Sequence, residues 1–419
     1  MIPALPVPVA ALRNARLADG TVADVRLDGP LVVAVEPPGT TAHGAGLELD
    51  LDGFVLLTAP AEPHAHLDKA LTFDEIAPPL GDLPSAIASF HTYAITADEH
   101  DIADRARRTL GRMLANGVTA VRTHVNFSPG PDALAGYRAL ATVRREFAGL
   151  VDLQIVTLPA EDTPDDVHED AFALGADLVG GAPHLWPDPI AGTDHLLDLA
   201  EALGVGADLH ADESLDGPVT LARFAERARG WSVGRSAGHC VRLGMLPEDE
   251  LAVLVDAVRA ADIGIIGLPI TNLYLQGWEQ PVATPRGLTA FRALIDAGVR
   301  VAAGADNVRD PFNPLGRCDP LETAMLLVAA GHLSPAEALH LVGDGARDVL
   351  GLPAAGPRTG AVADLLAVRA ETATEAIAFA SADRFVLHAG RLVAASVLDS
   401  RVAEPVRDVV LTATDPGAA

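Results

Sequence analysis

The sequence contains few cysteines, few aromatic residues and almost no lysine. Cys240 and Cys318 are the only cysteines in 419 residues. This excludes a disulfide framework and fits a reducing compartment, so we expect a cytoplasmic protein. Aromatic residues make up 4% of the chain, so the core must consist mainly of Ala, Val, Leu and Ile. Lys69 is the only lysine, and every other residue counted as Lys or Arg is arginine.

The sequence also lacks long apolar runs and an excess of basic residues. No run approaches the roughly 18 apolar residues of a membrane-spanning helix, and no basic region precedes an apolar stretch at the start, so no signal peptide is expected. Asp and Glu number 57 against 30 Lys and Arg, a formal net charge of −27. This charge repels phosphates and argues against nucleic-acid or anionic-membrane partners.

Three stretches of the chain differ in pattern. Residues 1–57 contain short β segments separated by turns, residues 58–355 alternate strand-length apolar runs with segments of helical period, and residues 356–419 return to β segments before a tail from about Thr412. The central runs are Val55–Ala59, Thr119–Phe127, Asp152–Leu158, Ala176–Ala182, Gly206–His210, Ser236–Val241, Gly264–Ile270 and Val299–Gly304. Helix candidates between them include Asp98–Ala115, Asp194–Leu203, Pro247–Ala260 and Leu288–Ala297.

This alternation predicts the fold class. Parallel strands require a crossover segment for each return, and eight strand–helix units close a TIM-type barrel. We therefore predict an α/β protein with a (β/α)₈ TIM-type barrel over residues 58–355. Residues 1–57 and 356–419 are predicted to form a small β domain together.

A His-x-His motif lies at the end of the first predicted barrel strand, in the sequence Glu62-Pro63-His64-Ala65-His66-Leu67-Asp68-Lys69. Side chains alternate along a strand, so His64 and His66 point the same way and can share one metal. His210 ends the fifth predicted strand and Asp306 follows the eighth. Barrel enzymes place their active sites at these strand ends, and three His with one carboxylate fit a catalytic metal site with a position open to water.

From about Pro60 to Leu350 the chain resembles the cytosine-deaminase-like branch of the amidohydrolase superfamily. The matching stretches are Glu62–Asp68, Val121–Val125, Asp152–Val156, His210–Glu213 and Asp310–Gly316. The resemblance implies one Zn²⁺ or Fe²⁺ bound by His64, His66, His210 and Asp306. It also implies Glu213 as general acid and base, and His239 as the residue that contacts the hydrolytic water. Relatives are often homo-oligomers, so that state stays open here.

The number of metals follows from the lysine content. Relatives with two metals bridge them through a carboxylated lysine of the barrel. Because Lys69 is the only lysine, that bridge cannot form, and a mononuclear site is expected.

The sequence departs from the cytosine deaminases at three places. Leu158-Pro159-Ala160 lacks the Gln that reads the cytosine ring, Asn307 replaces a second Asp, and Lys69 replaces a Thr. A pocket without these groups loses discrimination for cytosine. Lys69 with Asp306-Asn307 is more similar to the branch typified by N-isopropylammelide amidohydrolase. We therefore expect an oxo/amino pyrimidine or s-triazine substrate, with substrate contacts from Lys69, Asn307, His124, Gln154 and His184; for His124 and His184 a structural role is equally open.

These residues favour hydrolytic removal of ammonia or an amine from a heterocyclic C–N bond. A bound metal lowers the pKa of its water from about 15.7 toward about 7. Glu213 can collect the proton and deliver it to the leaving nitrogen, Asp306 can orient the water, and His239 can stabilise the developing oxyanion. Two alternatives remain. One is cyclic-amide ring opening at the same metal, and the other is a non-catalytic metal- or ligand-binding paralogue, which needs neither Glu213 nor His239.

Overall fold

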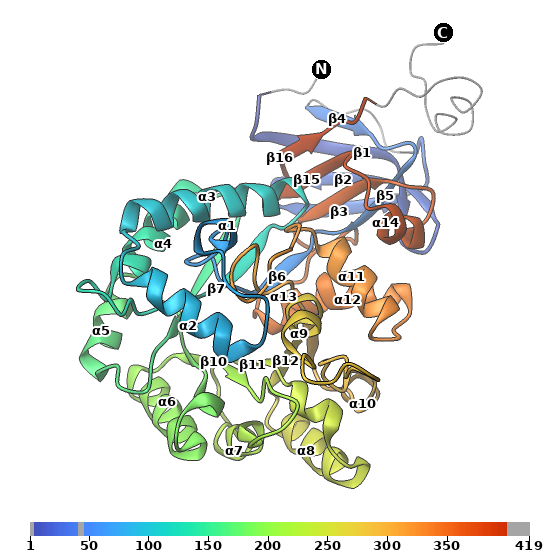
Figure 1. The fold of residues 1–419 in the computed structure, drawn as a ribbon. Coiled ribbons are helices and arrows are strands. Elements are labelled where there is room, and N and C mark those ends of the chain that lie inside the picture. Colours follow the sequence, from blue (N-terminus) through green and yellow to red (C-terminus); the bar gives the residue numbers. More distant parts are fainter. Residues whose placement is uncertain (1–3, 41–45, 400–419) are drawn as a thin grey trace. The chain divides into compact units, whose positions relative to one another are not determined.

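The computed structural model describes residues 4–40 and 46–399, which form two compact units (Figure 1). One unit contains residues 60–113 and 118–353. The other contains the described residues up to 59, from 114 to 117, and from 354 onward. The first is a (β/α)₈ barrel and the second is built on a β-sheet from both chain ends, which confirms the predicted fold class. The tail expected from about Thr412 lies outside the described residues.

Eight parallel strands form the barrel in chain order. They are β6 (Ala61–Ala65), β7 (Ala120–Asn126), β8 (Asp152–Leu158), β9 (Leu178–Gly181), β10 (Gly206–Ala211), β11 (Arg235–His239), β12 (Gly264–Gly267) and β13 (Val301–Ala303). Each pairs in parallel with the next. A parallel bridge between Ala65 and Asp306 connects the first strand to the segment after the last one. All eight carboxyl ends therefore lie at the same end of the barrel.

Helices surround these strands (Figure 1). They are α1 (Phe73–Ile76), α2 (Leu83–Ala94), α3 (Glu99–Ala115), α4 (Ala135–Glu146), α5 (Asp165–Ala173), α6 (Pro189–Leu203), α7 (Thr220–Arg227), α8 (Glu248–Ala260), α9 (Pro269–Leu275), α10 (Phe291–Asp296), α11 (Pro320–Ala329), α12 (Pro335–Val342) and α13 (Asp344–Val349), with short 3₁₀ turns η1 (Pro183–Leu185) and η2 (Val241–Met245). Helix α6 begins earlier than predicted because Asp188 caps it. The Asp188 carboxylate accepts the Ala191 N–H at 3.0 Å, and Pro189 suits the first helical position.

The first barrel strand was predicted wrongly. The run Val55–Ala59 contains β5 (Phe54–Thr58), which pairs with β14 and β1 of the other sheet, and the barrel begins with β6 after Pro60. A buried apolar run has the same composition in either sheet, so its sequence does not say which sheet it joins.

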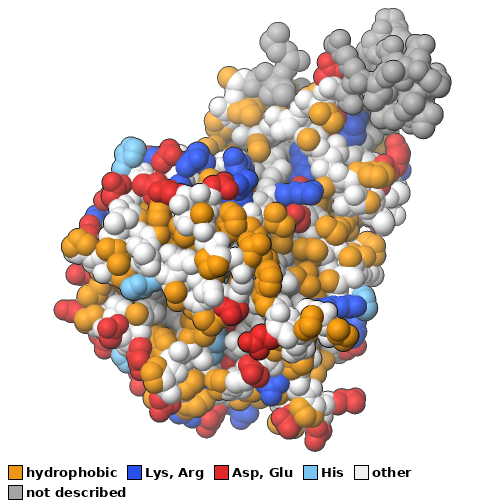
Figure 2. Space-filling view, viewed as in Figure 1, with side chains coloured by type: hydrophobic (Ala, Val, Ile, Leu, Met, Phe, Trp, Pro, Cys, Tyr) orange, Lys and Arg blue, Asp and Glu red, His pale blue; other side chains and the backbone are white. Residues whose placement is uncertain are grey.

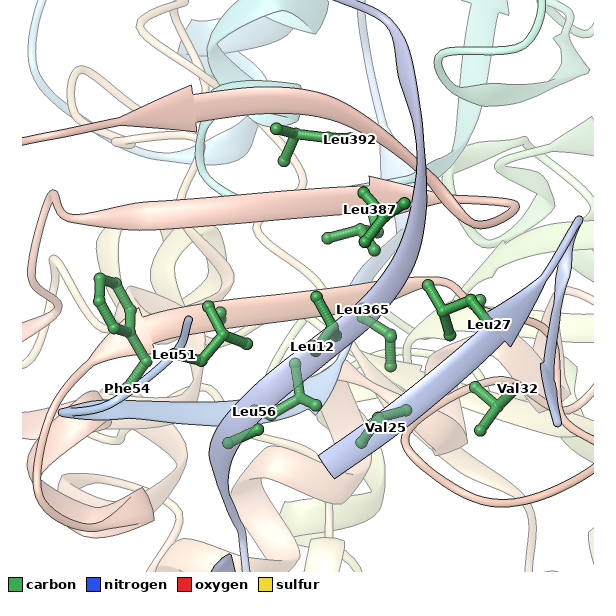
Figure 3. Close-up of a cluster of buried hydrophobic side chains, with 14 residues drawn as sticks. Leu12, Val25, Leu27, Val32, Leu51, Phe54, Leu56, Leu365, Leu387 and Leu392 are labelled. Atoms are coloured by element: carbon green, nitrogen blue, oxygen red, sulfur yellow. The ribbon is translucent and has the colours of Figure 1, made fainter. Parts of the chain in front are cut away.

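The β unit contains β1 (Val7–Leu17), β2 (Val22–Asp28), β3 (Leu31–Glu36), β4 (Leu47–Asp50), β5, β14 (Leu365–Arg369), β15 (Arg384–His388), β16 (Arg391–Ser396) and the helix α14 (Ala373–Phe379). Its buried core is mainly aliphatic, as the composition predicts, and includes Leu12, Leu56, Leu365 and Leu387 (Figure 3). The pattern did not predict β1, because a charged residue interrupts it. That residue, Arg13, is buried and forms ion pairs with Asp24 and Glu48.

No helix of the described ranges combines the length and apolarity needed to span a bilayer.

Candidate active site

Three imidazole nitrogens and one carboxylate oxygen converge at the carboxyl ends of the barrel strands. The Nε2 atom of His210 lies 3.2 Å from Nε2 of both His64 and His66. Asp306 Oδ1 lies 3.2 Å from His66 Nε2 and 3.8 Å from His64 Nε2. Ligand atoms that surround a tetrahedral zinc ion at about 2.0–2.1 Å lie roughly 3.3 Å from one another. The spacing therefore fits one divalent metal, and we call these four residues the metal cluster.

The chemistry of the metal cluster also fits a cation. All four side chains are buried, and neither oxygen of Asp306 has a hydrogen-bond partner among the described residues. Burial raises the pKa of Asp306 well above its usual range, and nearby carboxylates raise it further. Burial, together with repulsion from neighbouring cationic groups, lowers the pKa of His64, His66 and His210 well below the usual range. Neutral imidazoles and an unpaired buried carboxylate are costly to leave without a partner, and a bound cation removes that cost.

A glycine and a buried carboxylate position His64. A Cβ atom at Gly238 of β11 would lie 2.7 Å from His64 Cε1, so glycine leaves the space that the imidazole ring occupies. Glu62, two residues earlier on the same face of β6, accepts the N–H of Ala305 at 2.9 Å and that of His64 at 3.3 Å. Burial raises the pKa of Glu62 to about 8. Glu62 therefore links the start of the barrel to the segment that carries Asp306.

Glu213 lies beside the metal cluster and is buried. Its Oε1 is 3.4 Å from His239 Nδ1, and its Oε2 is 3.8 Å from His184 Nε2. Burial raises the pKa of Glu213 to about 8, and the charge of Lys69 partly opposes this effect. A carboxyl group with a pKa near neutrality can both accept and release a proton.

His239 ends β11 with a left-handed backbone, φ 68°, and Asp306 has φ 65°. Such strained residues concentrate at functional sites. The amide nitrogen of Asn272 in α9 donates to His239 Nδ1 at 3.1 Å, which leaves the ring proton on Nε2. This Nε2 has no hydrogen-bond partner among the described residues and lies 3.9 Å from Asp306 Oδ2. The imidazole N–H is therefore free to donate to an oxygen atom held between His239 and Asp306.

Replacing Asn272 with Leu is expected to lower kcat by about 10- to 100-fold, because a buried hydrogen bond worth about 1–3 kcal/mol no longer fixes the imidazole. The substrate KM and the metal content should change little, since Asn272 is neither a member of the metal cluster nor part of the cavity lining. Steady-state kinetics and metal analysis of the same preparation test this. An unchanged kcat would show that the His239 orientation does not depend on this amide.

Lys69 lies between two aromatic rings at the edge of the site. Its Nζ is 4.9 Å from the ring centroid of Phe90 in α2 and 4.9 Å from that of Phe312. The side chain is 4% exposed, and cation–π contact offsets part of the cost of burying its charge. The ammonium group also lines the cavity described next, where its N–H donors can reach a bound molecule.

A cavity of about 640 Å³ opens above the metal cluster. Its lining includes His66, His210, Asp306, Glu213 and His239, together with the predicted substrate contacts Lys69 and Asn307. Seven of the eleven residues predicted for metal binding, catalysis or substrate contact therefore line this cavity. His64, which is fully buried, completes the metal cluster below.

Two residues predicted to contact the substrate, His184 and His124, lie behind the cavity lining instead. His184 Nδ1 lies 3.1 Å from the His210 carbonyl oxygen, so it supports His210 and Glu213 from η1. His124 stacks on His64 with ring centroids 4.1 Å apart and is fully buried. Neither lines the cavity, so the substrate contacts expected at His184 and His124 are not formed at this surface, and the structure supports a positioning role.

The structure corrects the prediction that Gln154 contacts the substrate. Its amide accepts from Arg122 Nε at 2.9 Å and donates to the Leu350 carbonyl at 3.1 Å, and it lines a separate hollow with Leu350 and Leu352. It lies near the amino end of β8, four residues before Leu158, or roughly 13 Å at the rise of a strand. Gln154 therefore does not reach the substrate cavity.

Three residues of the site were not predicted. Asn272 lies within α9, the helix that follows β12, and Asn126 is the last residue of β7. Asn126 lines the cavity with its Oδ1 unpaired. Phe90 belongs to α2, a helix that the sequence pattern did not reveal. The strand-end rule that selected His210 would also have selected Asn126.

Comparison with known proteins agrees with this geometry. The model of the Amidohydrolase family matches residues 83–398. The chain belongs to the amidohydrolase family. It is accordingly a hydrolase of non-peptide C–N bonds, as the sequence predicts, and the metal cluster is its candidate metal site.

Three similar proteins indicate which branch of the amidohydrolase family this chain resembles. A pterin deaminase from Rhizobium rhizogenes is 32% identical over 403 residues, which cover 92% of this chain and 90% of the relative. The structure of 5-methylcytosine deaminase from Klebsiella pneumoniae with 5-fluorocytosine matches with a TM-score of 0.85 and 28% identity, covering 94% of this chain and 99% of that one. N-isopropylammelide isopropylaminohydrolase from Burkholderia multivorans matches with a TM-score of 0.80 and 28% identity, covering 93% and 99%. The predicted resemblance to cytosine-deaminase-like amidohydrolases is confirmed.

Proposed function

We propose that this amidohydrolase is a mononuclear metal-dependent deaminase of a fused-ring aminopyrimidine that carries an oxo group, as in a pterin. The observation that carries the proposal is the position of Glu213, beside His239 and next to the metal cluster, at the floor of a cavity that Lys69 also lines. The relative that is 32% identical over nearly the whole chain is a pterin deaminase, and a pterin is an oxo/amino pyrimidine with a second fused ring.

The metal cluster would hold one Zn²⁺ or Fe²⁺, which supplies Lewis acidity to a water molecule and to the ring. Glu213 takes a proton from the attacking water and transfers it to the leaving amino nitrogen. A C–O bond forms, the C–N bond breaks, and ammonia leaves with that proton. The second water proton ends on the ring as the oxo tautomer forms. His239 donates from Nε2 to the developing oxyanion, and Asp306 accepts from the water on its other side.

Lys69 recognises an oxygen of the ring in this proposal. Its ammonium group is held by Phe90 and Phe312. Because the side chain is already fixed in place, it can donate to a ring oxo group without losing further conformational freedom. Asn307 is held by Asp310, which accepts from its Nδ2 at 2.8 Å, and it supplies a second polar contact at the same wall.

Replacing Lys69 with Met should lower kcat/KM by about 10- to 100-fold, because a hydrogen bond to a charged donor contributes about 1.5–3 kcal/mol. The metal content should stay at the wild-type value, since Lys69 does not belong to the metal cluster. Kinetics with metal analysis check both parts. Wild-type kinetics in this variant would remove Lys69 from substrate binding.

The proposed function is tested by ammonia release across aminopyrimidines, 2-amino-4-oxopteridine and aminotriazines, with the mass of each product. Deamination gives one ammonia per turnover and an oxo product. Release from the pteridine supports the proposal, and release only from single rings contradicts the fused-ring assignment. A product that has gained one water without ammonia would instead show cyclic-amide ring opening.

A further inference from the structure

The substrate cavity differs in chemistry between its floor and its outer part. The polar groups named above, with Asn126, gather at the floor. The outer lining also contains the polar residues His91, Ser128, Asp162 and Thr163 but is mainly apolar. Its apolar side chains come from five separate segments, with Leu83 and Ile87 from α2, Pro129 and Ala133 before α4, Pro159 after β8, Val167 from α5, and Leu185 and Trp186 at η1. A ring bound at the metal cluster leaves this outer part unfilled, since about 300–1,000 Å³ is the volume that holds a drug-sized ligand.

Apolar side chains remain exposed to solvent at the cavity mouth. Ile87 is 38% exposed and Leu185 is 45% exposed, although they belong to α2 and η1 and line the same cavity. Hydrophobic side chains also gather over α2 on the face shown in Figure 2. Apolar groups that converge from separate elements around one opening are typical of a ligand-binding surface.

The aromatic part of this wall is fixed before a ligand binds. The Trp186 indole packs so closely on Gly192 of α6 that a Cβ atom there would collide with it. Phe127, also in the lining, packs on Tyr137 and His168 with ring centroids 4.8 Å apart in both pairs. Rigid aromatic walls lose little entropy on binding an apolar group.

Charge excludes an anionic occupant. Among the described residues that line the cavity, Lys69 is the only Lys or Arg, and it serves the ring at the floor. The mouth adds the exposed carboxylate of Asp162, and the whole chain carries a net charge of −27. A carboxylate on the substituent would have no counter-charge here.

We propose that the substrate carries a neutral aromatic substituent on the deaminated fused ring, and that the outer apolar part of the cavity binds it. This inference rests on the proposed deaminase function. The residues that bind the substituent are Ile87, Leu185 and Trp186. They act on substrate selection and not on the chemical step, so they determine specificity.

The test uses three substrates with the metal-loaded enzyme. These are 2-amino-4-oxopteridine, the same ring with a phenyl substituent, and the same ring with a carboxylate. The expected kcat/KM is at least about 10-fold higher for the phenyl compound than for the bare ring, because apolar contacts discriminate by about 10- to 200-fold, and the carboxylate compound should be the poorest. Leu185→Asp should reduce the phenyl-to-bare ratio of kcat/KM by about 10-fold. Val253→Asp, at a 73% exposed position of α8 outside the cavity, should leave the ratio unchanged.

The outcomes separate the two proposals. No ammonia from any of the three compounds would overturn the proposed function. Ammonia from all of them with equal kcat/KM, or with the carboxylate compound preferred, would overturn only the aromatic substituent. An unchanged ratio in Leu185→Asp would do the same, because its exposed side chain can be changed without loss of the fold.

Discussion

Replacing Glu213 with Gln is expected to reduce kcat by about 10²- to 10⁴-fold, the range that a positioned general acid and base contributes. Gln has nearly the same shape but cannot accept the proton of the attacking water. Burial already raises the pKa of Glu213 to about 8, so the native carboxyl exchanges protons near neutrality, and no other carboxylate of the described cavity lining lies beside His239 Nδ1. The readout is ammonia release under saturating substrate.

Metal content and the thermal midpoint serve as controls for the Glu213 variant. Both should match the wild type, because Glu213 is not a member of the metal cluster and Gln can occupy the same volume. A kcat within about 10-fold of wild type, outside the range given for acid–base residues, would show that Glu213 does not transfer the proton.

Replacing His210 with Ala is expected to abolish activity through loss of the metal. His210 Nε2 lies 3.2 Å from both His64 and His66, so it is central to the metal cluster. Loss of a direct ligand should weaken metal affinity beyond the roughly 10- to 100-fold cost of removing an outer partner. The thermal midpoint should also fall, since a bound metal stabilises the folded state by mass action.

His100→Ala is the matched control for the His210 variant. His100 is exposed on α3 and is not part of the cavity lining, so this variant should keep its metal and its rate. Metal analysis after gel filtration gives the comparison directly. A His210→Ala protein with wild-type metal content would exclude His210 as a ligand.

The sequence predicted that the four side chains of the metal cluster lie close together, because two simple periodicities determine their positions. Alternation along a strand places His64 and His66 on one face, and parallel strands bring the ends of β6, β10 and β13 to one rim. The prediction for Gln154 was wrong because it considered only which strand carries the residue. The distance of Gln154 from the carboxyl end of that strand can be counted from the sequence, and that distance excludes contact with the cavity.

Other features depend on tertiary packing that no local pattern contains. The run at Val55 has the same apolar composition in either sheet, and pairing with β14 decides its place. Asn272 was missed because its contact with His239 joins residues 33 positions apart. The aromatic neighbours of Lys69, Phe90 and Phe312, come from segments with no sequence relation to it. Such long-range pairings follow only from the folded chain.

The most direct test of the account is a metal titration of the apoprotein, with ammonia release from 2-amino-4-oxopteridine as the readout. One cluster of His64, His66, His210 and Asp306 predicts no activity without metal and a linear rise that stops at one equivalent of Zn²⁺ or Fe²⁺ per chain. Activity in the apoprotein, or a rise that continues to two equivalents, would contradict a single metal centre as the site of deamination.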